Sequence, residues 1–244
     1  MTADSTPVVV MASTKGGVGK TTLAFCLASE VASRLPGSAG GVACIDADPN
    51  LTLERAFRIA GSPGVRVSQA TGETLLEVLR QARQDSALVV IDLEGSANQA
   101  MLYACGKADV VLIPAQPSRY DVIEAVKTAG VVRQAADLVG REIPYRVILS
   151  RTPVLRQRVA EHSRSQFARA GLGLLEVELV HRTAFQQMTY TGQPPFVTSP
   201  DGGAARNVTA IADEVAALIG LPLGSRHLRE DRGQGEDALA EAQT

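Results

Sequence analysis

The residues best suited to chemistry lie at positions 14–22, which read TKGGVGKTT directly after an apolar run at 7–12. Glycines let a backbone wrap closely around an anion, because the dihedral angles that this requires penalise a Cβ atom. A helix that begins inside the loop adds partial positive charge at the same place. A glycine turn that binds nothing is the alternative. The favoured prediction is a loop that binds the phosphates of a nucleotide, through Lys15, Gly16, Gly17, Val18, Gly19, Lys20, Thr21 and Thr22.

Two side chains of this loop have specific expected roles. Lys20 is expected to reach the β- and γ-phosphates, and the Thr21 hydroxyl is expected to bind Mg²⁺. The common pattern has a glycine five residues before Gly19, where this chain has Thr14 followed by an additional lysine, Lys15. Lys15 is therefore either a second cation for the phosphates or a solvated surface lysine.

Carboxylates follow two other apolar runs. Asp92 ends the run 87–92 and is predicted to hold Mg²⁺ through a bound water, because Mg²⁺ dehydrates reluctantly. A helix-capping aspartate is the alternative. Asp46 and Asp48 lie two residues apart, so on an extended chain they point the same way. One of them could face the metal while the other aligns an attacking water, although a turn at 48–50 explains the same residues.

The elements around these residues must bring them together. Five continuous apolar runs are predicted to be strands covered on both faces, at 7–12, 42–46, 87–92, 109–114 and 145–150. Helical patterns lie at 19–34, 73–83, 120–138, 154–170 and 204–218. Helices between parallel strands predict an α/β fold, a doubly wound and mostly parallel sheet with helices on both faces. Ligands bind at the carboxyl ends of such strands, where the loop and the aspartates fall.

Length and composition suit one such domain. The chain has 244 residues, of which 45% are hydrophobic and 20% charged, and a net charge of −2, which is ordinary for a soluble globular protein. Its three cysteines share no short spacing, which argues against disulfides or a zinc site. No stretch approaches the ~20 apolar residues of a membrane span, so a cytoplasmic protein is expected. Residues 1–6 are expected to be a disordered lead, 7–222 one domain and 223–244 a disordered polar tail.

The motifs together resemble those of the ParA/MinD family of deviant Walker-A P-loop ATPases. The resemblance spans most of residues 7–219 and rests on the segments 15–22, 46–49, 91–92, 114–121 and 192–194. Two positions depart from the family pattern. Leu93-Glu94-Gly95 follows Asp92 where relatives usually have a proline, and Ser150 precedes Arg151 where many relatives have an asparagine that helps to hold the adenine.

The resemblance implies a mechanism. In the family, the lysine that matches Lys15 crosses a dimer interface and contacts the partner's nucleotide, so ATP holds a homodimer together and hydrolysis weakens it. Lys15, Lys20, Asp48 and Asp92 would be catalytic, with Asp48 positioning the water. Asp46 would support the site near the metal, and Arg151 would lie near the base. Turnover would be slow and stimulated by a protein partner, with ATP and Mg²⁺ as cofactors.

ParA-type members also bind DNA without sequence preference. Residues 146–182 contain seven arginines against three glutamates, and such side chains position a protein on phosphates without reading bases. A solvated charged helix is the alternative. The candidate DNA contacts are Arg156, Arg158, Arg164, Arg169 and Arg182.

The sequence therefore favours a cytoplasmic, nucleoid-associated ParA-like ATPase that segregates or positions a plasmid, a chromosome region or another cargo with an adaptor protein. No membrane anchor is expected, because the tail has no broad apolar face. The alternative is a P-loop phosphotransferase or ligase that acts on a small molecule.

Overall fold

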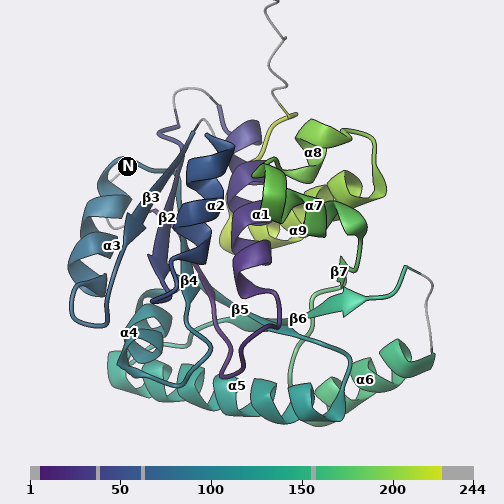
Figure 1. Ribbon diagram of the computed structural model, residues 1–244. Coiled ribbons are helices and arrows are strands. Elements are labelled where there is room, and N and C mark those ends of the chain that lie inside the picture. The colour runs from purple at the N-terminus through teal and green to yellow at the C-terminus, as the bar shows by residue number, and fades with distance from the viewer. Residues whose placement is uncertain (1–5, 37–38, 62–63, 155–157, 227–244) are drawn as a thin grey trace, which may run out of the picture.

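The computed structural model describes residues 6–36, 39–61, 64–154 and 158–226, and its centre is a parallel sheet (Figure 1). The sheet has seven strands in the order β3-β2-β4-β1-β5-β6-β7, and every neighbouring pair is parallel. The strands are β1 (Val8–Met11), β2 (Val42–Ala47), β3 (Val65–Gln69), β4 (Leu88–Leu93), β5 (Val110–Ala115), β6 (Tyr145–Thr152) and β7 (Leu179–Val180).

Helices cover both faces of this sheet, so the predicted doubly wound architecture is confirmed (Figure 1). One layer contains α3 (Leu75–Gln84), α4 (Gln99–Lys107), α5 (Arg119–Val139) and α6 (Arg158–Arg169), and adjacent members of this layer pack on one another. The other contains α1 (Lys20–Arg34), α2 (Thr52–Ala60), α7 (Thr183–Thr191), α8 (Pro195–Thr198) and α9 (Gly203–Ile219).

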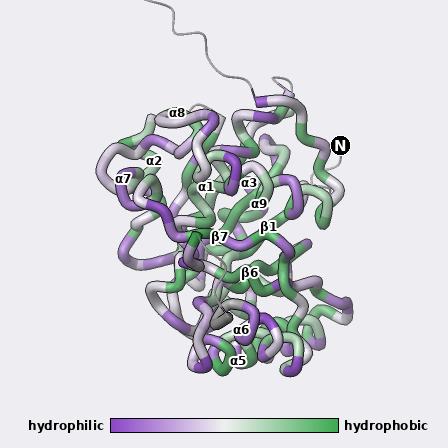
Figure 2. The backbone as a smooth tube through the Cα atoms, turned by 90° about the vertical axis from the view of Figure 1, so that its right-hand side faces the viewer, coloured by the Kyte–Doolittle hydropathy of each residue, from purple (hydrophilic) through white to green (hydrophobic). Residues whose placement is uncertain are grey.

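The strands are buried on both faces, as their continuous apolar runs predict. β1, β2, β4 and β5 have no exposed residue, and Figure 2 shows hydrophobic residues concentrated along the central strands. Two apolar clusters fill the space between the sheet and the two helical layers. In one of them the rings of Phe25 and Phe57 lie 4.5 Å apart and join α1 to α2.

The five predicted strands and five predicted helical stretches all correspond to elements of the structure. The elements that were not predicted are β3, β7, α2, α4, α7 and α8. Strand β3 lies at the edge of the sheet, where its residues are exposed or only partly buried, so it lacks the apolar run that marks an inner strand. Helix α4 contains Cys105 and is nine residues long, too short for a clear apolar period.

Both ends of the described chain make contacts with the rest of the domain. The Thr6 side chain is 4% exposed, and its hydroxyl donates to the carbonyl oxygens of Arg83 and Ser86 at 3.1 Å each. At the other end, residues 223–226 pack against α1 and α9, and the Gly224 amide donates to the Arg34 carbonyl. No helix of the described chain is long and apolar enough to cross a membrane.

A buried carboxylate explains why this C-terminal segment is ordered. Glu30 in α1 is fully buried, and its Oε1 accepts a hydrogen bond from Arg226 Nη2 at 3.0 Å and lies 3.7 Å from Arg34 Nη1. Arg226 also donates to Thr209 and lies 5.0 Å from the centre of the Phe196 ring. Because a buried charge is costly without partners, Glu30 requires these arginines.

We predict that Arg226→Ala lowers the free energy of unfolding by about 1–3 kcal/mol, because it removes one partner of a buried charge. Urea unfolding followed by circular dichroism measures the change. The control is Arg58→Ala on α2, which breaks an ion pair whose arginine side chain is 68% exposed and should change little. Equal effects of the two substitutions would contradict the role of Arg226.

Candidate nucleotide-binding site

The site lies where the connections of the sheet change direction. Strand β1 lies between β4 and β5, so the chain passes from one side of β1 to the other when it runs from β4 to β5. Ligands of open parallel sheets bind at the carboxyl ends of the strands at such a point. The register places Met11 opposite Asp92 and Asp46 opposite Asp92. The fold therefore brings residues 14–22, Asp46 with Asp48, and Asp92 to one edge, as predicted.

The loop between β1 and α1 has the backbone that its glycines allow. Gly17 and Gly19 have φ angles of 75° and 100°, in a region that other residues rarely adopt. Gly19 is the N-cap of α1 and no side chain caps the helix there, so its first amides can bind an anion. The Ser150 hydroxyl at the end of β6 donates to the Val18 carbonyl at 2.7 Å. Ser150 thus fixes the loop from the neighbouring strand.

Lys20 is positioned to bind an anion, which would replace the Lys15 carbonyl as the partner of its ammonium group. Its side chain lies in a buried position, 6% exposed, and its Nζ donates to the Lys15 carbonyl at 3.3 Å. Burial lowers the pKa of Lys20, and the charges of Asp92, Asp48 and Glu94 oppose that effect. An ammonium group in this environment gains more from a phosphate than one in water does.

The burial and hydrogen bonding of Asp92 show most directly whether the site could bind Mg²⁺. Its side chain is fully buried, and neither carboxylate oxygen has a hydrogen bond with good geometry to any described residue. Burial raises its pKa to about 7, although the nearby Thr21 hydroxyl lowers it. A buried carboxylate without partners is expected to bind a cation. The described residues contain no group of three or more His, Cys, Asp or Glu side chains that could hold a metal. The site therefore fits Mg²⁺ whose other ligands are phosphate, hydroxyl and water.

Asp46 and Asp48 have different roles. Asp46 is fully buried, and its two oxygens accept hydrogen bonds from the backbone amides of Asp48 at 3.1 Å and Glu54 at 2.9 Å. These hydrogen bonds fix the connection between β2 and α2, so Asp46 has a structural role beside the predicted metal site. Asp48 is half-buried and accepts hydrogen bonds from the Asn50 amide and side chain at 2.8 and 2.9 Å. Residues 48–50 thus form the turn that was the alternative interpretation, and Asp48 still places a carboxylate at this edge of the sheet.

The Lys15 ammonium group has a different partner from that of Lys20, although both lysines belong to one loop. Its Nζ makes an ion pair with Asp121 Oδ2 at 2.9 Å, and its side chain is 38% exposed. Asp121, at the start of α5, is 2% exposed. Burial tends to raise the pKa of Asp121, but hydrogen bonds from Ser118 and Lys15 lower it overall. The additional lysine of the loop is thus held by α5, with its side chain partly exposed.

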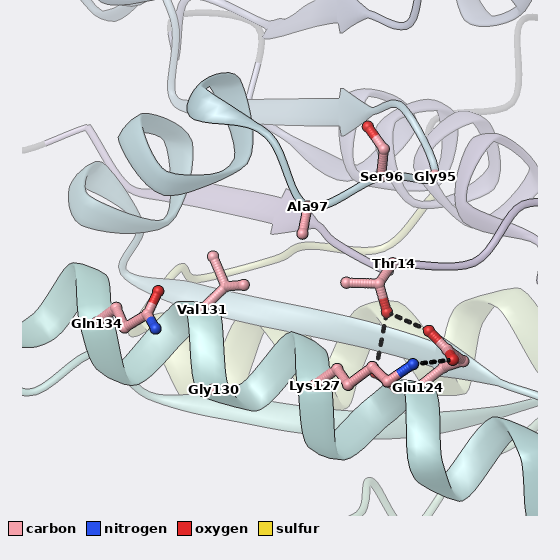
Figure 3. Close-up of a pocket in the computed structure, with 9 residues that line it drawn as sticks. All are labelled: Thr14, Gly95, Ser96, Ala97, Glu124, Lys127, Gly130, Val131 and Gln134. Atoms are coloured by element: carbon pink, nitrogen blue, oxygen red, sulfur yellow. Dashed lines mark hydrogen bonds and ion pairs between the residues drawn. The ribbon is translucent and has the colours of Figure 1, made fainter.

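Thr14 joins the loop to the same helix. Its amide donates to the Thr128 hydroxyl at 3.1 Å, and its own hydroxyl donates to Glu124 Oε2 at 2.8 Å. Figure 3 shows Thr14 beside Glu124 and Lys127, at the end of a groove with a volume of about 580 Å³ between α5 and residues 95–97.

The loop after β4 lies against the phosphate-binding loop. A Cβ atom on Gly95 would lie 2.7 Å from the Gly16 amide nitrogen, so only glycine allows this contact.

The predicted base-binding and DNA-binding arginines are in different situations. Arg151 is exposed and has a φ of 53°, which is unusual for a residue with a side chain. Arg156 lies outside the described residues, as does the side chain of Arg158. Arg169 is exposed. Arg164 instead donates to Glu178 at 2.8 Å and to the Leu175 carbonyl at 3.1 Å, and Arg182 packs on Gly203. Arg164 has hydrogen-bond partners within the fold and Arg182 packs against it, so these two arginines are weaker candidates for DNA contacts.

Three contributors to the site were not among the predicted site residues. Ser150, Asp121 and Thr14 act through hydrogen bonds to residues more than 100 positions away in the chain. Asp121 and Ser150 do lie in segments that resemble the family, but their contacts depend on tertiary structure. No local spacing could reveal them.

The parallel sheet, the glycine-rich loop with buried Lys20 and the buried Asp92 define a P-loop nucleotide-binding protein. The family model described as VirC1 protein matches residues 7–197. Protein ParA of Rhizobium radiobacter is 30% identical over 190 residues, which cover 76% of this chain and 83% of that protein. The chain belongs to the VirC1 family, within the ParA/MinD group of P-loop ATPases.

Solved structures agree with this fold. An ATP complex of a Cyanothece McdA variant superposes with a TM-score of 0.69 at 19% identity, covering 86% of this chain and 96% of that chain. The cell-division protein MinD of Pyrococcus horikoshii in complex with Mg-ADP gives a TM-score of 0.66 at 18% identity, covering 88% and 98%.

We predict that Asp92→Asn stabilises the nucleotide-free protein in EDTA, and more so at about pH 8 than at about pH 5. The pKa of Asp92 is raised from 3.8 to about 7 on folding, so its ionisation costs stability progressively as the pH rises between these values. Urea unfolding of both proteins at the two pH values measures this. The same gain at both pH values would contradict the unpaired carboxylate.

Proposed function

We propose that this protein is a slow ATPase that forms an ATP-dependent sandwich homodimer, binds DNA without sequence preference and positions a cargo. The observation that carries the proposal is the difference between the two loop lysines. Lys20 is buried within the charge field of Asp92, whereas the partly exposed Lys15 side chain is held by Asp121. A partly exposed cation can serve a second subunit, and the family membership supports this assignment.

Within one subunit, different groups of the chain have different roles in nucleotide binding and hydrolysis. The amides of residues 16–20, together with the Lys20 ammonium, would neutralise the phosphates. Thr21, and Asp92 through a bound water, would hold Mg²⁺, which would supply polarisation of the phosphates and neutralisation of the charge that develops on them. Asp48 accepts a hydrogen bond from the attacking water, and Asp46 holds Asp48 in place through its amide. The similar McdA and MinD structures, which contain ATP and Mg-ADP, support these cofactors.

Between subunits, the nucleotide provides the attraction. Two triphosphates brought face to face would repel each other, and a lysine from each subunit offsets that repulsion. To cross the interface, Lys15 must give up its ion pair with Asp121. ATP therefore favours the dimer only if the contact with the partner's phosphates exceeds the lost pair, and loss of the γ-phosphate returns the balance to the monomer.

DNA binding and cargo complete the proposal. Arg169 at the end of α6 is exposed, and Arg156 and Arg158 precede or begin the same helix. A dimer doubles such a surface, so its affinity for phosphates would rise steeply on assembly. The protein would be cytoplasmic, associate with the nucleoid in its ATP state and be released when an adaptor protein stimulates hydrolysis.

We predict that Lys15→Ala abolishes dimerisation in ATP while nucleotide still binds, because Lys20 and the loop amides remain. Light scattering after gel filtration and a fluorescent ATP analogue measure the two properties. Lys127→Ala is the matched control, since it removes a lysine of α5 that pairs with Glu124 and has a 60% exposed side chain. A Lys15→Ala protein that dimerises with ATP as the wild type does would refute the role in the partner's site.

We also predict that ATP, and neither ADP nor the absence of nucleotide, causes the protein to retard a DNA fragment of arbitrary sequence in a gel. The retardation should weaken steeply with added salt, and Arg169→Glu should weaken it for all sequences alike. Arg58→Glu on α2 is the charge-matched control. A monomer in ATP that shifts no DNA at low salt would instead favour a phosphotransferase or ligase acting on a small molecule.

A further inference from the structure

Two carboxylates directly follow the last paired residues of β2 and β4. Within the sheet Asp46 lies opposite Asp92, and the pairing ends one residue later with Ala47 opposite Leu93. Asp48 and Glu94 are the residues that follow. Because β2 and β4 are parallel neighbours, Asp48 and Glu94 leave the sheet at the same edge. Both are half-buried.

Both members of the outer pair lie near the phosphate-binding lysine. Burial lowers the pKa of Lys20, and the charges of Asp48 and Glu94 are among those that oppose this effect. The residue after Glu94 lies against the phosphate-binding loop, because a Cβ on Gly95 would approach the Gly16 nitrogen to 2.7 Å. This backbone contact keeps Glu94 close to the phosphate-binding loop.

Only one of the two carboxylate oxygens of Glu94 accepts hydrogen bonds from the described residues. Its Oε2 accepts hydrogen bonds from the Ser96 hydroxyl at 3.2 Å and from the Asn98 amide group at 3.3 Å. Its Oε1 has no hydrogen-bond partner in the part of the chain that the structure describes. One oxygen is therefore held by the loop, and the other is available to a ligand.

We propose that Glu94 and Asp48 together bind the water that attacks the γ-phosphate, each accepting one of its O–H groups. The inference rests on the proposed ATP hydrolysis and adds a second carboxylate at the reacting atoms. A water that donates to two carboxylates is fixed in orientation, with a lone pair directed at the phosphorus.

The hydrolytic step balances without another reactant. The water oxygen bonds to the γ-phosphorus while the bond from that phosphorus to the β,γ-bridging oxygen breaks, and the electron pair of that bond leaves with ADP. One water proton passes through a carboxylate to the inorganic phosphate, and the other stays on the oxygen that has bonded to phosphorus.

The test compares single-turnover ATP hydrolysis by the full-length wild type, Glu94→Gln, Asp48→Asn and the double variant. Glu94→Gln should slow hydrolysis roughly tenfold or more, with an unchanged dissociation constant for ATP and a longer-lived dimer. The double variant should be little slower than the slower single variant, because both residues hold one water. Glu94→Asp should recover part of the rate.

A matched substitution separates water binding from loop shaping. Ser96→Ala removes one hydrogen bond of Glu94 but keeps its carboxylate, so it should retain most of the rate. Glu94→Gln hydrolysis at the wild-type rate, or an equal loss in Ser96→Ala, would overturn the assignment while ATP-dependent dimerisation and DNA retardation still stand. A wild type that neither hydrolyses ATP nor dimerises would overturn the proposed function as well.

Discussion

Charge that is buried without a partner governs this site. Asp92 is enclosed at the end of β4, and among the described residues neither of its oxygens has a hydrogen bond with good geometry. Lys20 is also buried, and its Nζ donates to the Lys15 carbonyl. Such an arrangement costs stability by itself and becomes favourable when a metal and phosphates bind. The parallel sheet maintains it, because the register of β1, β2 and β4 and the helices on both faces keep these side chains buried.

The two lysines of the loop have different partners. Lys20 is buried and donates to the Lys15 carbonyl, whereas the ammonium group of Lys15 pairs with Asp121. The start of α5 also holds Thr14 through Glu124 and Thr128. Helix α5 therefore contacts the first residues of the loop at three side chains. If Lys15 moves, its ion pair with Asp121 of α5 must break. Helix α5 therefore connects the loop that binds the nucleotide to a surface that a partner can reach.

The inner strands, and the convergence of the glycine-rich loop and the aspartates on one edge of the sheet, could be predicted because each depends on a local pattern. Continuous apolar runs mark strands buried on both faces, and glycine spacing marks the loop. The edge strand β3 and the short helix α4 were missed because they lack these patterns. The partners of Lys15 and Val18 were missed for another reason, since Asp121 and Ser150 come close to them only in the folded chain. Arg164 shows the converse, because its positive charge suggested DNA whereas its contacts are with Glu178 and Leu175.

The central claim is that Lys15 exchanges a partner in its own subunit for one in a second subunit. A crystal structure of an Asp48→Ala variant with ATP and Mg²⁺ tests it most directly. The claim predicts a dimer in which Lys15 has left Asp121 and its Nζ contacts the phosphates of the nucleotide bound to the other subunit. A nucleotide-loaded structure in which Lys15 remains paired with Asp121 of its own chain, and touches no nucleotide of another subunit, would contradict it.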